Sequence, residues 1–265
     1  MLTTLLLVIL GFVAGLLGAL TGIGGGVLLT PILALHFGVP IREAIGASLV
    51  AVITTSAASS SVHLQRHTTD IRLGMTLELA TALGAAVMAY LVGYFNRSVL
   101  EGLFAAFLLY SSIMILRKRG KGPDEDTTPA LNGDVVIPPY EPQRYPLGLG
   151  ASLIAGALSG LLGIGGGPIK VPVMFIFMNV PLMVATATSN FMIGVTAAAS
   201  AIVYYRRGDI DPQIAAPLAV GVFLGSLLGA RLAPRVHTRI VMYLLVAVML
   251  YLAGHLVFHV LEGVL

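Results

Sequence analysis

Two glycine-rich pentapeptides are the residues of this chain best suited to binding chemistry. Gly22-Ile23-Gly24-Gly25-Gly26 recurs as Gly163-Ile164-Gly165-Gly166-Gly167, at an offset of 141 residues. Each glycine costs about 1 kcal/mol relative to alanine inside a helix, so this density of glycine predicts a break in the helix. A break frees backbone N–H groups, and the helix that begins after it carries partial positive charge at its N-terminus, so both features suit an anion.

The glycines also allow a ligand, or another backbone, to approach closely because no Cβ stands in the way. Close helix packing is therefore the alternative to ligand binding, since small residues line many helix interfaces in membranes. The glycines predicted to contact a small anionic substrate are Gly22, Gly24, Gly25, Gly26, Gly163, Gly165, Gly166 and Gly167.

Lys170 is the charged residue placed to act with these glycines. It lies three residues after Gly167 in an apolar segment, and its equivalent in the first half is Leu29. A charge in such a segment is expensive and usually faces a cavity or a partner. We expect an anionic solute as its counter-ion; the alternatives are a side chain that reaches out to the membrane surface or one that pairs with a carboxylate. Glu78 is a candidate proton carrier for coupling, or a partner for Lys170, and we expect it near the membrane interface.

A matched stripe of hydroxyl side chains follows each break. Spacings of seven and eleven residues put each stripe on one helix face: Ser48, Thr55 and Ser59, then Ser189, Thr196 and Ser200. Ser48 and Ser189 are the stronger substrate ligands because each opens its helix. Asn190, whose equivalent is Leu49, adds an amide without a polar counterpart. Alternatively, such hydroxyls only bond to carbonyls of the preceding turn.

Other chemistry finds little support in the sequence. His63 and His67 are four residues apart, as are His255 and His259, with Glu262 beyond. This spacing can bind a metal on one helix face, but each pair lacks a firm third ligand, and we expect interfacial histidines and no metal. There is no cysteine, and no Gly-x-Ser-x-Gly, His-Glu-x-x-His or phosphate-binding loop is present. We therefore expect no enzyme activity, no cofactor and no ATP coupling.

Composition indicates the elements that carry these residues. The chain has 265 residues, of which 57% are hydrophobic and 10% charged, with mean hydropathy +0.95. A soluble domain carries about 25% charged residues. We predict an all-α polytopic membrane protein that contacts the lipid bilayer and no nucleic acid. The N-terminus lacks the basic region of a cleavable signal. The predicted apolar segments are 3–37, 44–64, 74–95, 98–116, 147–178, 184–204, 213–233 and 240–261.

The two halves read as homologous repeats. Repeat 1 spans residues 1–117 with the first break, a cytoplasmic linker loop spans 118–146, and repeat 2 spans 147–265 with the second break. The linker is rich in charge and proline and is predicted to be flexible. The offset of 141 holds without a gap and aligns Gly15 with Gly156, Pro31 with Pro172, Val39-Pro40 with Val180-Pro181, Arg66 with Arg207, and Asp70 with Asp211.

The first segment of each repeat decides the topology. A helix over 3–37 would be about 50 Å long, which exceeds a crossing of about 30 Å. The segment is either a tilted, broken span or a re-entrant hairpin, and a hairpin leaves three transmembrane helices per repeat, so the second repeat would be inverted. With hairpins, ten lysines and arginines lie on the linker side and four on the other; with simple spans the division is nine to five. We favour inverted repeats with a cytoplasmic linker and both termini outside.

The duplicated Gly-x-Gly-Gly-Gly break, the proline soon after it and the Val-Pro before the next helix resemble the sulfite exporter TauE/SafE family, also called the toluene-sulfonate uptake permease group. The resemblance covers 4–117 and 147–260. It implies secondary transport of sulfite or an organosulfonate such as sulfoacetate, in either direction, across the cytoplasmic membrane of a prokaryote. The eight glycines carry over from the family motif, whereas Lys170 is assigned from its charge.

The sequence thus predicts a secondary transporter that moves a small sulfur-containing anion by alternating access, because paired helix breaks in corresponding halves mark transporter binding sites. Two alternatives stay open. One is transport of a small carboxylate or another solute, and the other is an anion channel on the same scaffold. A homodimer is expected only by analogy with carriers that need a fixed scaffold.

Overall fold

The computed structural model describes residues 2–117, 139–233 and 238–262, and within these ranges it is helical, without strands. Most of the predicted linker, 118–146, lies outside the described residues. The helices of the first half are α1 (Leu2–Thr21), α2 (Gly26–His36), α3 (Ile41–Gln65), α4 (Ile71–Leu91) and α5 (Arg97–Arg117). Those of the second half are α6 (Tyr145–Leu162), α7 (Gly167–Pro172), α8 (Leu182–Arg206), α9 (Pro212–Leu232) and α10 (Thr238–Glu262). A 3₁₀ turn, Val92–Tyr94, follows α4, and a π-helical stretch, Val173–Phe177, follows α7.

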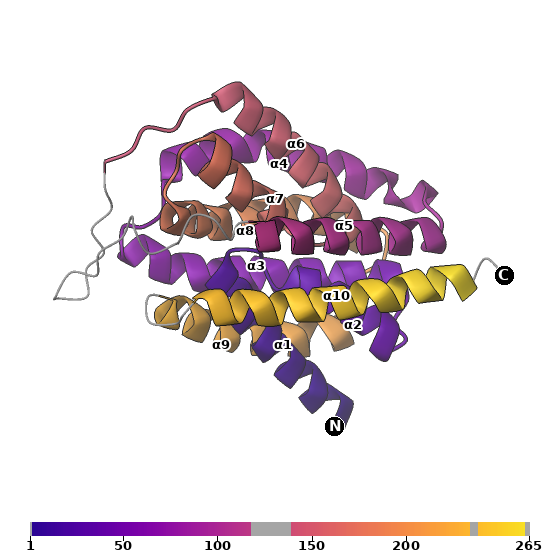
Figure 1. Ribbon diagram of the computed structural model, residues 1–265. Coiled ribbons are helices and arrows are strands. Elements are labelled where there is room, and N and C mark those ends of the chain that lie inside the picture. Colours follow the sequence, from indigo (N-terminus) through magenta and orange to yellow (C-terminus); the bar gives the residue numbers. More distant parts are fainter. Residues whose placement is uncertain (1, 118–138, 234–237, 263–265) are drawn as a thin grey trace.

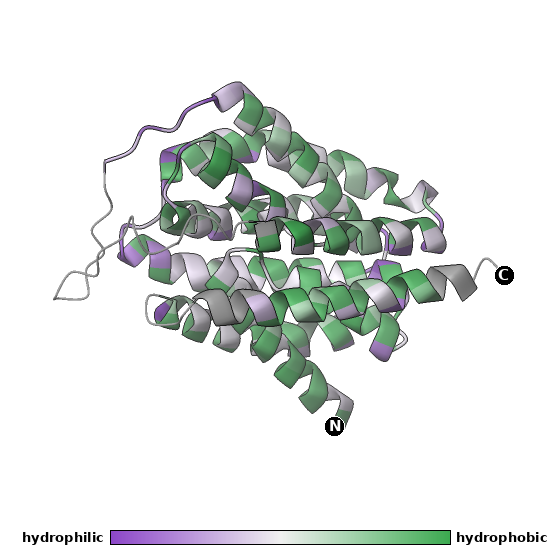
Figure 2. Cartoon of the chain, in the orientation of Figure 1, coloured by the Kyte–Doolittle hydropathy of each residue, from purple (hydrophilic) through white to green (hydrophobic). Residues whose placement is uncertain are grey.

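The described helices are those of a membrane protein. Seven helices within the described ranges are long and apolar enough to cross a bilayer, whereas α2 and the segment Gly167–Phe177 are too short. Hydrophobic residues cover most of the length of the helices, and the more hydrophilic residues gather toward their ends (Figure 2). The prediction of an all-α polytopic membrane protein is confirmed.

The chain turns back on itself at both pentapeptides. A Cβ on Gly25 would lie 3.1 Å from the carbonyl oxygen of Ala14, and a Cβ on Gly166 would lie 3.1 Å from that of Ala155. These residues are eleven positions apart, so in a straight helix they would be separated by about 16 Å. Segments α2 and α7 therefore run back beside α1 and α6. The pentapeptide glycines that adopt the left-handed backbone this turn requires are Gly22, Gly24, Gly163, Gly165 and Gly166.

Helices from the two halves interleave. Helix α1 packs mainly against α9, and α6 packs against α4; α3 packs against α8, and α5 against α10. The offset of 141 residues converts the first of these pairs into the second. In Figure 1, α3 and α8 lie near the middle of the bundle, and the start of α1 and the end of α10 lie on the same side. The inverted relationship of the repeats stays a prediction.

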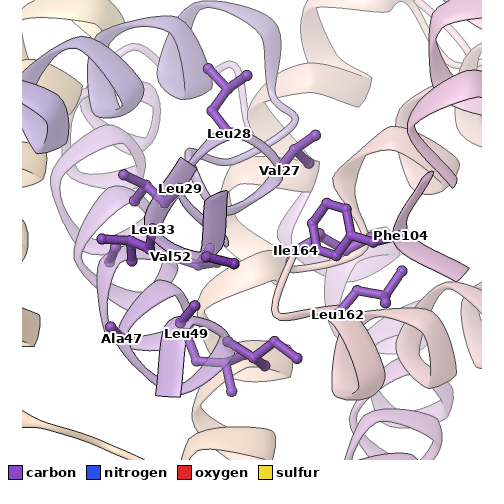
Figure 3. Close-up of a cluster of buried hydrophobic side chains, with 14 of the residues drawn as sticks. Val27, Leu28, Leu29, Leu33, Ala47, Leu49, Val52, Phe104, Leu162 and Ile164 are labelled. Atoms are coloured by element: carbon purple, nitrogen blue, oxygen red, sulfur yellow. The ribbon is translucent and has the colours of Figure 1, made fainter. Parts of the chain in front are cut away.

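A buried apolar cluster holds the first break. Lipid is as apolar as these side chains, so the cluster stabilises the fold by close packing rather than by leaving water. Figure 3 shows side chains of this cluster from both halves of the chain. Helix α2 contributes Val27, Leu28, Leu29 and Leu33, α3 contributes Leu49 and Val52, and α5 contributes Phe104. Leu162 at the end of α6 and Ile164 of the second pentapeptide complete the set. Leu29, the equivalent of Lys170, is completely buried here.

Aspartates cap the two equivalent helices α4 and α9. The Asp70 carboxylate accepts a hydrogen bond from the Leu73 backbone N–H, and Asp211 accepts one from Gln213. Asp70 also accepts a 2.9 Å hydrogen bond from the hydroxyl of Tyr140, which precedes α6. Partial burial and the neighbouring Asp70 carboxylate both raise the pKa of Tyr140 above its ordinary value. The Tyr140 contact fixes the start of α4, the helix that carries Glu78.

Candidate functional site

The two helix breaks meet inside the bundle. The Ser48 hydroxyl on α3 donates a 3.0 Å hydrogen bond to the carbonyl oxygen of Gly163, and the Ser189 hydroxyl on α8 donates a 2.9 Å bond to that of Gly22. The offset of 141 residues makes these two bonds equivalent. Each serine was expected to open its helix, but α3 begins at Ile41 and α8 at Leu182, so both serines lie inside their helices. From there each serine holds the pentapeptide of the opposite half.

Glycine is required where the pentapeptides touch. A Cβ on Gly26 would overlap the carbonyl oxygen of Gly163, and a Cβ on Gly167 would lie 2.5 Å from that of Gly22. Close packing therefore explains these two glycines. Backbone donors remain at the same place, because among the described residues the N–H groups of Gly24, Gly25, Gly165 and Gly166 donate no hydrogen bond.

Lys170 lies beside the second pentapeptide in a buried polar triad. Its ammonium group donates to the Glu78 carboxylate at 3.1 Å and to the Thr196 hydroxyl at 2.9 Å. The Thr196 hydroxyl in turn donates to the other Glu78 oxygen at 2.6 Å. Lys170 is 2% exposed and Glu78 3%. The Lys170 side chain also passes close to Gly166, since a Cβ there would lie 3.3 Å from its Cε atom.

The triad corrects two expectations. Lys170 has a protein carboxylate as its counter-ion, which was the alternative to the favoured anionic solute, and Glu78 is buried rather than interfacial. The packing of α4 against α6 and α8 explains both differences, because it brings Glu78 within hydrogen-bond distance of Lys170 and Thr196. A charge inside the membrane needs a partner, and the fold supplies one.

The equivalent place beside the first break is apolar. Leu29 takes the position of Lys170, and Ala219 that of Glu78. Thr55, the equivalent of Thr196, donates only to the carbonyl oxygen of Ala51 one turn earlier, at 3.0 Å. The polar triad thus occurs beside one of the two breaks, on a backbone frame that both breaks share.

Asn190 adds an unsatisfied buried group to the second half. Its amide nitrogen donates to the carbonyl oxygen of Ala19 at 3.2 Å and lies 3.5 Å from Nε2 of His63. Its amide oxygen has no hydrogen-bond partner among the described residues. Asn190 is completely buried, so an acceptor without a donor is available at the end of the first hairpin.

Comparison with known proteins agrees with this architecture. Residues 7–256 match the family model described as sulfite exporter TauE/SafE. The chain belongs to the sulfite exporter TauE/SafE family. It is 28% identical over 229 residues to "Probable membrane transporter protein YunE" of Bacillus subtilis, covering 82% of this chain and 84% of that protein.

A second TauE/SafE-like relative is archaeal. The chain is 28% identical over 232 residues to "Probable membrane transporter protein MJ0441" of Methanocaldococcus jannaschii, covering 82% of this chain and 81% of that protein. No solved structure is significantly similar to the chain. With its apolar helices, this TauE/SafE protein is a membrane transporter and a multi-pass protein of the cell membrane. The relatives carry transporter names, which agrees with the expectation that the chain is not an enzyme.

The sequence pattern of this TauE/SafE chain did not identify His63 as part of the interior. His63 was expected at the interface, but it is buried and contacts Asn190 and Thr68, whereas His67 is exposed. The repeat offers a sequence signal for this burial, because the residue equivalent to His63 in the second half is Tyr204. The Tyr204 hydroxyl is also buried and donates to the carbonyl oxygen of Gly160 at 3.0 Å. A polar residue at both equivalent positions marks a shared inward face.

The remaining side chains that the sequence singled out make contacts outside the site. Thr55, Ser59 and Ser200 donate to carbonyl oxygens four residues earlier, which is the alternative given above for the hydroxyl stripes. The ring of His255 lies 6.0 Å from that of His36, and the side chains of His259 and Glu262 lie outside the described part. No group of three potential metal ligands occurs among the described residues.

Proposed function

We propose that this transporter moves a small sulfur-containing anion, sulfite or an organosulfonate, across the cytoplasmic membrane by alternating access. The observation that carries the proposal is Lys170, a fully buried cation on a re-entrant segment beside glycine amides that have no hydrogen-bond partner among the described residues. The family description supports a sulfur oxyanion over other solutes.

Sulfite and sulfonates offer three acceptor oxygens, which match the donors around the second pentapeptide. The Lys170 ammonium group supplies charge-assisted hydrogen bonds, which are stronger than neutral ones. The N–H groups of Gly165 and Gly166 supply directed donors, and neither residue adds a Cβ of its own beside them. In the proposed site these groups act together with Gly22, Gly24, Gly25, Gly26, Gly163, Gly167, Ser48, Ser189 and Asn190.

Alternating access would use the contact between the two hairpins. Ser48 and Ser189 each hold the pentapeptide of the opposite half, so releasing one pair would open the meeting point toward one side of the membrane. Movement of one unit against another around a fixed central site is the general scheme of such carriers. The homodimer stays a prediction.

The proposal is tested by uptake into proteoliposomes of labelled sulfite, sulfoacetate, methanesulfonate and acetate, with protein-free liposomes as the control. We expect saturable flux of at least one sulfur anion, accelerated by the same anion on the opposite side. Acetate uptake at an equal rate would favour the carboxylate carrier. Ohmic current without trans-stimulation would show a channel instead.

A further inference from the structure

We propose that Glu78 is the proton-binding group of this transporter and that one proton on Glu78 accompanies each anion bound to Lys170. The inference rests on the proposed function, because it takes Lys170 as the anion ligand. It adds the coupling ion, the group that carries it and the stoichiometry.

The geometry makes anion and carboxylate compete for one cation. Among the described residues, the Lys170 ammonium group donates hydrogen bonds to Glu78 and Thr196, and both lie within 3.1 Å of it. An anion that binds the ammonium group must displace the Glu78 carboxylate, wholly or in part. The displaced carboxylate would then be a buried charge without a compensating cation, which is strongly unfavourable at membrane depth. Protonation removes that charge.

Within the part of the chain that the structure describes, the helices packed around Glu78 supply no substitute cation. Helix α4 packs against α6, α8 and the turn Val92–Tyr94. The only titratable residue of α6 is Tyr145 at its start, that of the turn is Tyr94, and those of α8 are Tyr204, Tyr205 and Arg206 at its far end. On α7 the charged residue is Lys170 itself, and α4 carries Arg72 six residues before Glu78.

Charge balance then fixes the stoichiometry. The empty site holds one carboxylate and one ammonium group and is neutral. With a monovalent anion on Lys170 and a proton on Glu78, the site is again neutral. Anion alone leaves it negative and proton alone leaves it positive, and both charged forms are penalised inside the membrane. The proton enters from the water on the side where the anion binds and leaves with it on the other side.

The first break shows that the fold does not require this ion pair. There the equivalent positions are Leu29 and Ala219, which carry no charge. A buried ion pair often stabilises a protein no better than apolar residues of similar volume. The pair beside the second break therefore points to a use beyond packing.

Proton uptake can be measured on binding in detergent solution, without transport. The ligand is methanesulfonate, whose charge stays at −1, titrated by calorimetry in two buffers of different ionisation enthalpy. We expect uptake of about one proton per anion by the wild type and none by Glu78→Gln, which still binds. Glu101→Gln is the matched control, because Glu101 is equally buried and paired with Arg97 on α5; it should keep the uptake. Binding by the wild type without proton uptake would overturn the coupling and leave the proposed function standing.

Flux gives a second readout. In proteoliposomes the wild type should accumulate methanesulfonate in response to a pH gradient and should ignore the membrane potential. Glu78→Gln leaves the empty site with one positive charge, so the flux through this variant should respond to the membrane potential. Its accumulation of methanesulfonate in response to the pH gradient should be at least tenfold lower than that of the wild type. If Glu78→Gln does not fold, the wild-type measurement alone tests the proposal. Wild-type flux that is driven by the membrane potential and unaffected by the pH gradient would contradict it. A wild type that neither binds nor transports any of the four test anions would overturn the proposed function as well.

Discussion

The two halves of the bundle share a backbone and differ in the side chains placed on it. Around the second break, Glu78 from the first half forms a buried polar triad with Lys170 and Thr196 from the second half. The equivalent positions around the first break are Ala219, Leu29 and Thr55. This difference distinguishes two roles of the region around the breaks. The paired breaks build the frame, and the charged pair beside the second break provides the chemistry.

The shared part is a reciprocal contact. Gly26 and Gly167 face the carbonyl oxygens of the opposite pentapeptide, and Ser48 and Ser189 hold those same carbonyls. Substitutions in the shared part should therefore act equally in both halves. Substitutions in the triad should have larger effects than the same substitutions at the equivalent positions beside the first break.

Replacing Lys170 should give the largest effect. Lys170→Met leaves Glu78 buried without a cation, which costs about 3–5 kcal/mol, and it should remove anion binding. Leu29→Met, the same change in the first half, should cost less than about 1.5 kcal/mol because the volume is conserved. Thermal unfolding followed by circular dichroism in detergent checks both. Adding Glu78→Gln to Lys170→Met should recover most of the lost stability, and no recovery would contradict the ion pair.

Adding a methyl group at the shared contact should give the next largest effect. Gly26→Ala and Gly167→Ala each force a Cβ against a carbonyl oxygen of the opposite pentapeptide. We expect a loss of about 1–3 kcal/mol for each, as for other overpacked sites. The amount of monodisperse protein that survives heating measures the loss. A large effect in one half and none in the other would break the equivalence of the two breaks.

The equivalent threonines should differ more modestly. Thr196→Val removes a hydroxyl that both accepts from Lys170 and donates to Glu78, and the loss should be about 1–3 kcal/mol. Thr55→Val removes only a bond to a carbonyl of its own helix, and the loss should be less than about 1 kcal/mol. Unfolding midpoints compare the two variants directly. Equal losses would show that the Thr196 hydroxyl adds nothing to the triad.

The smallest effect should come from the cap of α4. Tyr140 donates to Asp70, and its pKa is raised in the folded state. A raised pKa adds stability that is full below the unfolded value of about 10 and is lost as the pH rises through the folded value. Tyr140→Phe should therefore lower Tm at pH 7, on the order of 1–2 °C, and the difference should shrink above about pH 10. A difference that grows at alkaline pH would contradict this hydrogen bond.

Sequence patterns predicted the class of protein, the two breaks and the asymmetry between Lys170 and Leu29. Composition, glycine density and a fixed offset can all be read from the sequence without knowing which helices pack together. These patterns named Glu78 as one possible partner of Lys170 but favoured an anionic solute, since these residues lie 92 positions apart and meet only through the packing of α4 beside α6 and α8. The bonds of Ser48 and Ser189 to the opposite half, 115 and 167 residues away, are equally invisible to helix periodicity. The burial of His63 was missed for the same reason. Its contact with Asn190 depends on long-range packing that the sequence pattern does not show.

The most direct measurement converts the surroundings of the second break into those of the first. The double variant Lys170→Leu and Glu78→Ala places the side chains of Leu29 and Ala219 in the triad, and it should fold because the first break is surrounded in that way. Calorimetry with methanesulfonate should show binding at least about tenfold weaker than in the wild type, since a charge-assisted hydrogen bond contributes about 1.5–3 kcal/mol. Unchanged affinity in the folded double variant would contradict the assignment of the anion site to Lys170.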